Sequence, residues 1–231
     1  MAPKTPTPSR RAGLLVPSSY TTLEADLLRH APGGWSFHSA RMYLEDSSIV
    51  SLARMLDEFA LTAARDLASI EPDLVIFSSA SAAALRGNEI EDNLIRRLED
   101  IVHAPVISPM KAARQMLKSM ELEHLVVITA YGSAINQQIR AGLETDGFKV
   151  MRIEGLNLTN CRDMARVNTD QITRLARLLV KDNQPEAVFI CGSNMPILSH
   201  LKTLQASMPC LVITTNNVIL EEVVKFGCKP F

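Results

Sequence analysis

The sequence predicts an α/β fold with parallel sheets, and three observations support this class. Short runs of β-branched and aromatic residues alternate along the chain with longer segments of helical period. Several of the short runs are apolar throughout, as is typical of strands buried on both faces of a parallel sheet. Hydrophobic residues make up 47% of the 231 residues, so the chain can fill one large α/β core or two small ones.

Eight short segments are expected to form strands, because each is mostly β-branched or aromatic and ends at small or polar residues. In chain order they are Gly13 to Val16, Ser36 to Met42, Leu74 to Phe77, Val106 to Ile107, Leu125 to Ile128, Lys149 to Ile153, Ala187 to Ile190 and Leu211 to Ile213.

The segments between the strands are expected to be helices. The longest runs from Ile49 to Ile70, with apolar residues every three or four positions, Asp46 and Ser47 as candidate caps, and Pro72 after its end. The others are Glu89 to Val102, Lys111 to Met120, Ser133 to Thr145, Asp170 to Leu179, Pro196 to Gln205 and Val218 to Phe226. Strands that alternate with helices of this length imply βαβ units.

Charge and hydropathy exclude several classes of protein. Lys and Arg number 24 against 25 Asp and Glu, a balance that argues against a nucleic-acid partner. No apolar run approaches the ~20 residues of a membrane span. Residues 1–10 are rich in proline and lack the apolar run of a signal peptide, so we expect a disordered tail. These features predict a soluble, cytoplasmic protein without a membrane partner; a homo-oligomer is left open.

The chemistry-bearing residues argue against a metal or a nucleotide cofactor. The four cysteines form no CxxC pair, and the five histidines are scattered, without an HExxH pattern. There is no GxGxxG or Walker loop. Four thiols in a chain of this length fit a reducing compartment better than a disulfide framework.

Cys191 is the first candidate for a catalytic role, because it ends a predicted strand and is followed by Gly192 and Ser193. The amides after it and the next helix N-terminus would place partial positive charge at this position. Such a site can lower a thiol pKa below its usual ~8.5 and donate hydrogen bonds to an anion. A free cysteine is equally often a buried, inert core residue, so both interpretations stay open.

Hydroxyl groups follow other predicted strands. Tyr131 comes just after the Leu125 to Ile128 strand and could donate its phenol O–H into a cleft or simply pack at its rim. The segment Pro17-Ser18-Ser19-Tyr20 and the segment Ser79-Ala80-Ser81 also follow strands. Their hydroxyls suit carboxylate binding at a helix N-terminus, and equally suit ordinary N-capping.

A weak internal echo relates the two halves of the chain. The segment from Val75 to Ser81 resembles the segment from Phe189 to Ser193 when Ser79 is set against Cys191. Both are apolar strands that end in small polar residues. Ligands of open parallel sheets bind beyond the carboxyl ends of strands, so the two ends could share one site. Any two strand-to-helix turns can also look alike over five residues.

Taken in order, these segments resemble the arylmalonate decarboxylase and maleate cis-trans isomerase group of the aspartate/glutamate racemase superfamily. The resemblance runs from about Arg11 to Pro230. The matching segments are Val16 to Glu24, Thr129 to Tyr131 with Asn136, Met164 to Val167, and Ile190 to Gly192.

The resemblance implies an α/β fold of two pseudo-symmetric, Rossmann-like lobes. Each lobe would hold a four-stranded parallel sheet, and the active site would lie in the cleft between them. The first lobe would comprise residues 11–113 plus 214–231, and the second residues 114–213. Members of the group need neither a cofactor nor a metal.

The resemblance also assigns roles to individual positions. Racemases and isomerases of the group use two cysteines; the second falls on Cys191, whereas the first falls on Ser79 and is missing. The family tyrosine falls on Tyr131. The Thr-Ser pair of the decarboxylase dioxyanion hole falls on Ala80-Ser81, and the amide after the cysteine is that of Gly192. The maleate isomerase asparagine falls on Tyr20, a departure that argues against maleate as the substrate.

A single cysteine favours decarboxylation, because loss of CO2 leaves an electron pair on carbon without any base, and one acid then suffices. We therefore expect a decarboxylase of a malonate-like dicarboxylate. Cys191 would protonate the enediolate, Tyr131, Ser81 and the Gly192 amide would stabilise it, and the loop of Pro17, Ser18, Ser19 and Tyr20 would contact the carboxylates, with Ser193 nearby. Two alternatives stay open: an isomerase or racemase that uses Ser79 in place of the first cysteine, and a non-catalytic carboxylate-binding protein.

Overall fold

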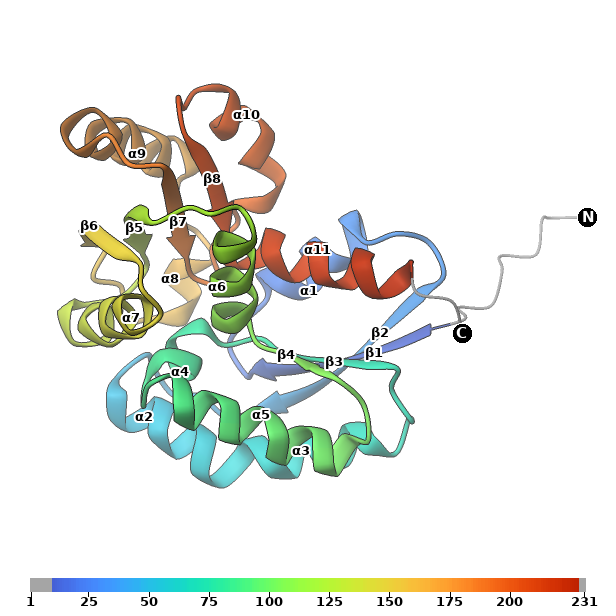
Figure 1. The fold of residues 1–231 in the computed structure, drawn as a ribbon. Coiled ribbons are helices and arrows are strands. Elements are labelled where there is room, and N and C mark those ends of the chain that lie inside the picture. Colours follow the sequence, from blue (N-terminus) through green and yellow to red (C-terminus); the bar gives the residue numbers. More distant parts are fainter. Residues whose placement is uncertain (1–9, 229–231) are drawn as a thin grey trace, which may run out of the picture.

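The computed structural model describes residues 10–228, which form two four-stranded sheets flanked by helices (Figure 1). Every strand pair in both sheets is parallel. The first sheet has the order β2-β1-β3-β4 and the second has the order β6-β5-β7-β8. The two halves of the chain therefore repeat one topology. Residues 1–9 of the predicted tail lie outside the described part of the chain, and Arg10 is the first residue of β1.

The first half of the chain builds the first sheet and the helices around it. Its elements are β1 (Arg10–Pro17), α1 (Thr22–His30), β2 (Trp35–Met42), α2 (Ile49–Arg54), a π-helical segment (Met55–Phe59), α3 (Ala60–Ala68), β3 (Leu74–Phe77), α4 (Ala80–Ala84), α5 (Asn88–Val102) and β4 (Val106–Ile107). Helices α3 and α5 pack against each other over one face of this sheet.

The second half begins with α6, which connects the sheets. Its elements are α6 (Pro109–Ser119), β5 (His124–Thr129), α7 (Ser133–Thr145), β6 (Lys149–Gly155), α8 (Cys161–Met164), α9 (Thr169–Asn183), β7 (Ala187–Cys191), a 3-10 turn (Leu198–His200), α10 (Leu201–Ala206), β8 (Leu211–Thr214) and α11 (Thr215–Gly227).

The last helix, α11, joins the two halves. It starts directly after β8, packs against α6 and α1, and runs above the first sheet in Figure 1. Near its end the Phe226 ring contacts the Trp35 ring, with ring centroids 5.9 Å apart. The lobe boundaries at residues 113 and 213 stay a prediction.

All eight predicted strands are confirmed, with ends that differ by at most three residues. Three helices were not predicted: α1, α4 and α8. The predicted helix from Ile49 to Ile70 is present but contains the π-helical segment. Its expected caps are wrong, because Ser48 caps α2 by accepting a hydrogen bond from the Ser51 amide at 3.2 Å. Ser47 instead donates its hydroxyl to the carbonyls of Leu158 and Thr159 in the other half.

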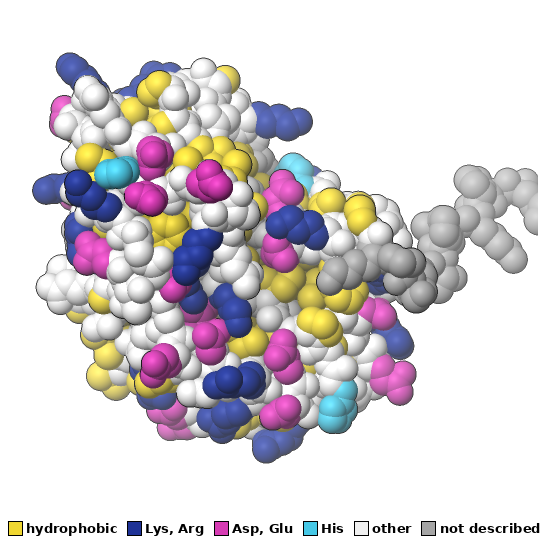
Figure 2. All heavy atoms as spheres, viewed as in Figure 1, with side chains coloured by type: hydrophobic (Ala, Val, Ile, Leu, Met, Phe, Trp, Pro, Cys, Tyr) yellow, Lys and Arg dark blue, Asp and Glu magenta, His cyan; other side chains and the backbone are white. Residues whose placement is uncertain are grey.

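The exposed surface shown in Figure 2 carries acidic and basic side chains intermingled, without a broad patch of one sign. None of the helices within residues 10–228 has the length and apolarity that crossing a membrane requires.

The strand order determines where a ligand would bind. The strand order reverses between the two central strands of each sheet, β1 and β3 in the first sheet and β5 and β7 in the second. On either side of this point the chain proceeds to the outer strand on that side. In open parallel sheets ligands bind at this switch point, beyond the carboxyl ends of the central strands. The predicted site residues follow these four strands, and the two echo segments end the equivalent strands β3 and β7.

Candidate active site

Two buried tyrosines form the centre of the site. Tyr20 follows β1 and is 0% exposed, and Tyr131 follows β5 and is 1% exposed. The Tyr20 phenol lies among the hydroxyls of Ser81, Tyr131 and Ser79. Burial raises the pKa of both phenols well above the ordinary 10.0, so both are neutral O–H donors.

Several hydroxyl groups in the segments that follow the central strands are closed off from solvent. Within residues 10–228, the side-chain oxygens of Ser19, Tyr20, Ser81, Tyr131 and Ser193 make no hydrogen bond of normal geometry, although all are closed off from solvent. An unpaired buried hydroxyl costs about 1–3 kcal/mol. Five such groups, Ser81 at the start of α4 and the other four in the loops after the central strands, indicate donors kept free for a polar ligand.

The backbone around Tyr131 is held by its neighbours. The Tyr131 amide donates to the Thr129 hydroxyl at 3.1 Å, and this hydroxyl donates to Asn136 Oδ1 at 2.6 Å. Asn136 thus stabilises the turn that carries Tyr131. Thr129 and Asn136 therefore orient the tyrosine loop.

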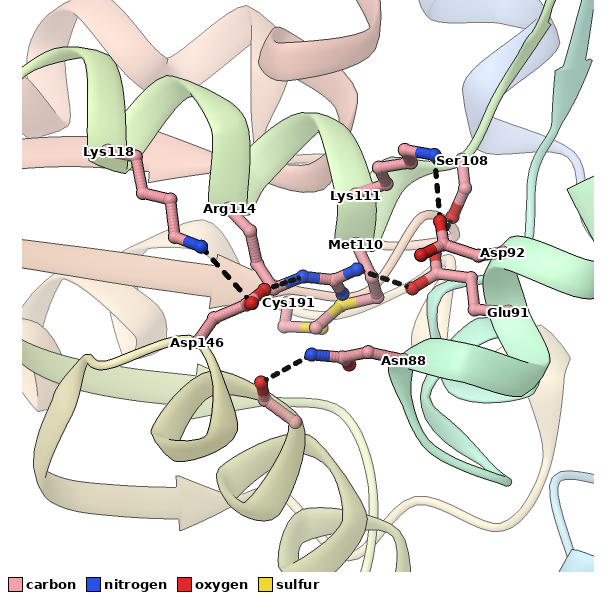
Figure 3. A network of polar contacts seen from close by, with 11 residues as sticks. Asn88, Glu91, Asp92, Ser108, Met110, Lys111, Arg114, Lys118, Asp146 and Cys191 are labelled. Carbon is pink, nitrogen blue, oxygen red and sulfur yellow. Dashed lines mark hydrogen bonds and ion pairs between the residues drawn. The ribbon is translucent and has the colours of Figure 1, made fainter.

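Cys191 ends β7 and is 0% exposed. Its thiol donates to the thioether of Met110, with the sulfur atoms 3.6 Å apart, and Figure 3 shows this contact. The expectation of a lowered thiol pKa is wrong: burial raises the pKa of Cys191 far above its ordinary 9.0. The strand end and the following turn do not compensate for the loss of water. Cys191 also lies close to Tyr131. It is a neutral acid, not a standing thiolate.

Ser79 follows β3, and its hydroxyl caps α4 by accepting from the Ala82 amide at 3.4 Å. Its side chain is close to Tyr20, with which it shares the centre of the site. Capping was one of the two roles that the sequence left open for this hydroxyl. Among the described residues, no histidine or carboxylate contacts Ser79 that would activate it as a base.

The remaining predicted binding residues have structural partners. Pro17 ends β1 and accepts from the Tyr20 amide at 2.9 Å. Ser18 accepts from the Leu44 amide at 3.0 Å. Ala80 is buried as the first residue of α4.

Gly192 was expected to offer a free backbone amide. This amide instead donates to the hydroxyl of Thr215, at 3.3 Å, so the expected oxyanion contact is already occupied. Thr215 begins α11, which is why the sequence around Gly192 gave no sign of this partner.

A groove of about 740 Å³ lies beside the buried centre and has Ser18, Ser19, Thr21, Leu44 and Cys161 among its lining residues. Cys161 had no assigned role in the sequence; it begins α8, is 3% exposed, and has Ser19 as a neighbour of its thiol. The catalytic candidates Cys191, Ser79 and Tyr131 are buried and do not line this groove.

Asn194, which the sequence reasoning missed, links the segments of the site. Its Oδ1 accepts from the amides of Thr21 at 2.9 Å and Thr22 at 3.2 Å. Its Nδ2 donates to the carbonyl of Cys161 at 2.7 Å. Asn194 lies three residues after Cys191, and a polar residue so soon after a strand end was the available signal.

No group of three or more histidine, cysteine, aspartate or glutamate side chains within residues 10–228 is placed to hold a metal ion. The donors that converge on the site are neutral hydroxyls, with the buried thiol of Cys191 beside Tyr131 and that of Cys161 beside Tyr20. This arrangement can hold the oxygens of a carboxylate and deliver one proton.

Comparisons with known proteins agree with this fold. Two maleate isomerases are similar in sequence. The protein from Nocardia farcinica is 25% identical over 205 residues, which cover 85% of this chain and 81% of the relative. The protein from Geobacillus stearothermophilus is 22% identical over 223 residues, which cover 90% and 88%.

Solved structures of both enzymes share the fold. The Nocardia farcinica maleate cis-trans isomerase bound to TRIS matches with a TM-score of 0.85 at 23% identity, over 96% of this chain and 93% of its own. A liganded mutant of arylmalonate decarboxylase matches with a TM-score of 0.88 at 16% identity, over 96% and 94%. The family model of arylmalonate decarboxylase matches residues 12–226. The chain therefore belongs to the arylmalonate decarboxylase family, whose relatives include maleate isomerases.

Proposed function

We propose that the protein is a cofactor-independent decarboxylase of a malonate-like dicarboxylate and that Cys191 is its proton donor. One observation supports this most strongly. The neutral thiol of Cys191 at the end of β7 lies beside Tyr131 and its buried hydroxyl neighbours, whereas the equivalent position after β3 holds Ser79, a helix cap, in place of a second thiol. This set of groups suits a reaction that needs one acid and no base.

The reaction follows from these groups. The bond between the α-carbon and one carboxylate breaks, CO2 leaves, and the electron pair stays on the α-carbon as an enediolate. The Cys191 S–H proton then passes to that carbon, and the resulting thiolate takes a proton from water. Burial disfavours an ionised thiol, so it also favours this reprotonation by water, which returns Cys191 to its neutral form.

The hydroxyls would stabilise the charge that develops. Tyr131 lies close to Cys191 and to Tyr20, so both phenols can donate to the oxygens of one enediolate beside the thiol. Ser81 lies beside both phenols and adds a third O–H. Loss of one such donor costs on the order of 10²–10³ in rate at comparable oxyanion sites. Removal of the leaving carboxylate from water at this buried centre would promote loss of CO2.

Cis-trans isomerisation of maleate is the second candidate, favoured by the names of the sequence relatives. One solved structure of the Nocardia farcinica enzyme carries a covalently bound succinylcysteine intermediate. An equivalent step here would need a thiolate to add to the double bond. Burial disfavours ionised Cys191, and Ser79 has no activating base, so this chemistry has weaker support in the geometry.

Incubation of the protein in D2O with phenylmalonate, maleate and glutamate, followed by proton NMR, separates the possibilities. We expect deuterated phenylacetate from phenylmalonate, with neither fumarate nor α-deuterated glutamate. Fumarate would replace the proposal with the isomerase, and α-deuterated glutamate would replace it with a racemase. Silence with all three acids and with alkylmalonates would favour a carboxylate-binding protein.

A pair of variants tests the proton donor. Cys191→Ala should lower kcat by about 10²–10⁴-fold, because a positioned acid contributes about that much and the enediolate would have to wait for water. The matched control is Cys228→Ala, which removes an exposed thiol and should leave kcat unchanged. Full activity of Cys191→Ala would overturn the assignment.

A further inference from the structure

A buried ion network lies next to Cys191 and is not used by the proposed reaction. Arg114 on α6 contacts two carboxylates: its Nη2 lies 2.8 Å from Glu91 Oε2, and its Nε lies 2.6 Å from Asp146 Oδ2 (Figure 3). The side chains of Arg114 and Glu91 are only 6% and 1% exposed. Ser108 donates to the second oxygen of Glu91, and Lys118 contacts the second oxygen of Asp146 at 3.1 Å.

The network joins the two halves of the molecule. Glu91 belongs to α5, which packs on the first sheet, whereas Asp146 directly follows α7, which packs on β6 of the second. Arg114 lies on the connecting helix α6 and bridges them. A second contact between α5 and α7 reinforces the link, since Asn88 Nδ2 donates to the Gly142 carbonyl at 2.9 Å. The position of α6 relative to both halves therefore depends on Arg114.

The same helix carries the residue that contacts the catalytic candidate. Met110 precedes Arg114 by four residues, so both side chains lie on one face of α6, one turn apart. Met110 is 1% exposed, and its sulfur lies 3.6 Å from that of Cys191. A thioether has no proton to donate, so the thiol must be the donor of this contact.

We propose that Arg114 is a positioning residue for Cys191: by bridging Glu91 and Asp146 it fixes α6 so that Met110 accepts a hydrogen bond from the thiol. The Cys191 sulfur is then held in one place beside Tyr131, with its S–H directed to a weak acceptor that releases it easily. The consequence for turnover rests on the proposed function, whereas the consequence for the thiol does not.

Arginine suits this role better than lysine would. The two contacts use different nitrogen atoms of one planar guanidinium: Nη2 points toward Glu91 on α5, and Nε points toward Asp146, just after α7. A lysine ammonium is a single point charge on a flexible stem and cannot hold both carboxylates in this geometry. The substitution Arg114→Lys thus keeps the charge and removes the bridge.

The S–H stretching band in the infrared spectrum reports the hydrogen bond of a thiol, and subtraction of the Cys191→Ala spectrum isolates the Cys191 band. We expect this band to move to the position of a free thiol in Met110→Leu and to move in the same direction in Arg114→Lys. The matched control is Lys111→Met, which breaks the more exposed pair of Lys111 with Asp92 on the same helix. That variant should leave the band in place.

The second measurement is steady-state kinetics with the dicarboxylate that the protein decarboxylates. Met110→Leu and Arg114→Lys should lower kcat by about 10²-fold, the cost of a misplaced catalytic group, with KM within twofold of wild type. An unchanged Cys191 band in a folded Arg114→Lys protein would overturn the proposal, as would a rise in KM with kcat unchanged. If Arg114→Lys does not fold, Asp146→Asn removes one contact and is judged by the same criteria. Shifted bands in a protein that turns over no acid would leave the positioning role intact and reject the proposed function alone.

Discussion

At the residue scale, Gly155 shows how closely the backbone must pass the tyrosine loop. A Cβ atom at this position would lie 2.1 Å from the Tyr131 carbonyl oxygen and 2.4 Å from Asn136 Nδ2. Both neighbours belong to the turn that holds Tyr131 in the site, and neither distance is compatible with a side chain. Glycine is required here by the space between two segments.

We predict that Gly155→Ala destabilises the protein by about 3 kcal/mol, because backbone atoms must move apart to admit the methyl group. The matched control is Gly33→Ala, since a Cβ there has no atom within 4 Å. That change should stay within about 0.5 kcal/mol. Urea unfolding of the three proteins measures both values, and equal stabilities would contradict the close approach.

The positions of the site residues could be predicted from the sequence better than their protonation and their hydrogen-bond partners. Cys191, Tyr131 and the hydroxyl segments follow strands, and parallel strand order brings such ends together, so their convergence could be predicted. The pKa of Cys191 could not, because it depends on complete burial under Met110, which comes from a distant helix. The partner of the Gly192 amide, Thr215, was hidden for the same reason.

At the scale of elements, α1 lacks a cap of its own. Thr21 precedes it and makes no side-chain capping hydrogen bond. Asn194 from the loop after β7 takes this role, because its Oδ1 accepts from the amides of Thr21 and Thr22. The start of α1 is thus fixed by a residue more than 170 positions away. This explains why local patterns did not predict the helix that follows Tyr20.

We predict that Asn194→Ala lowers the free energy of unfolding by about 1–3 kcal/mol, because it leaves two helix amides and the Cys161 carbonyl unpaired. It should also raise KM, since Tyr20 directly precedes the released helix start. The control is Asn168→Ala, which removes the local cap of α9 at the Asp170 amide. The control should cost about 1 kcal/mol and leave KM unchanged. A KM that rises equally in both would contradict the capping role of Asn194.

Some helices and strands carry a hydrophobic pattern in their own residues that predicts them, and others do not. Strands such as Leu74–Phe77 and helices such as Ser133–Thr145 carry their hydrophobic pattern within themselves, and the structure confirms both. The short helices α4 and α8 have five and four residues, too few to show a helical period. They form where the backbone turns at the site, and tertiary packing decides their conformation.

At the scale of the whole molecule, the buried neutral acids make stability depend on alkaline pH. Burial raises the pKa of Cys191 above 9.0 and the pKa values of Tyr20 and Tyr131 above 10.0. These groups keep their protons in the folded state, whereas the unfolded chain loses them once the pH passes the ordinary values. The unfolded state then binds fewer protons, so the free energy of unfolding falls as the pH rises.

We predict that the free energy of unfolding begins to fall near pH 9. The slope reaches about 1.4 kcal/mol per pH unit for each group that ionises on unfolding. Cys191→Ala should reduce the earliest part of this loss, between about pH 9 and pH 10, where the buried thiol of Cys161 contributes as well, while Cys228→Ala should not. Urea unfolding at several pH values measures the slope. Stability that is level from pH 7 to pH 11 would show that the three acids are not buried as described.

The repeated strand order is the property of the whole molecule on which the functional account depends. Because β3 and β7 occupy equivalent places in the two sheets, Ser79 and Cys191 follow equivalent strands. The division into lobes at residues 113 and 213 stays a prediction. Whether Ser79 and Cys191 serve opposite faces of one substrate can be measured directly.

The most direct test of the central claim, that Cys191 alone protonates one face, is the stereochemistry of the Ser79→Cys protein. Wild type should give one enantiomer of the monoacid from a disubstituted malonate and should not racemise it. Ser79→Cys adds a second thiol, so the pair can act as acid and base in turn. We predict a lower enantiomeric excess by chiral chromatography and deuterium exchange at the α-carbon in D2O. Wild-type racemisation that Ser79→Ala abolishes, or unchanged stereochemistry in Ser79→Cys, would contradict the account.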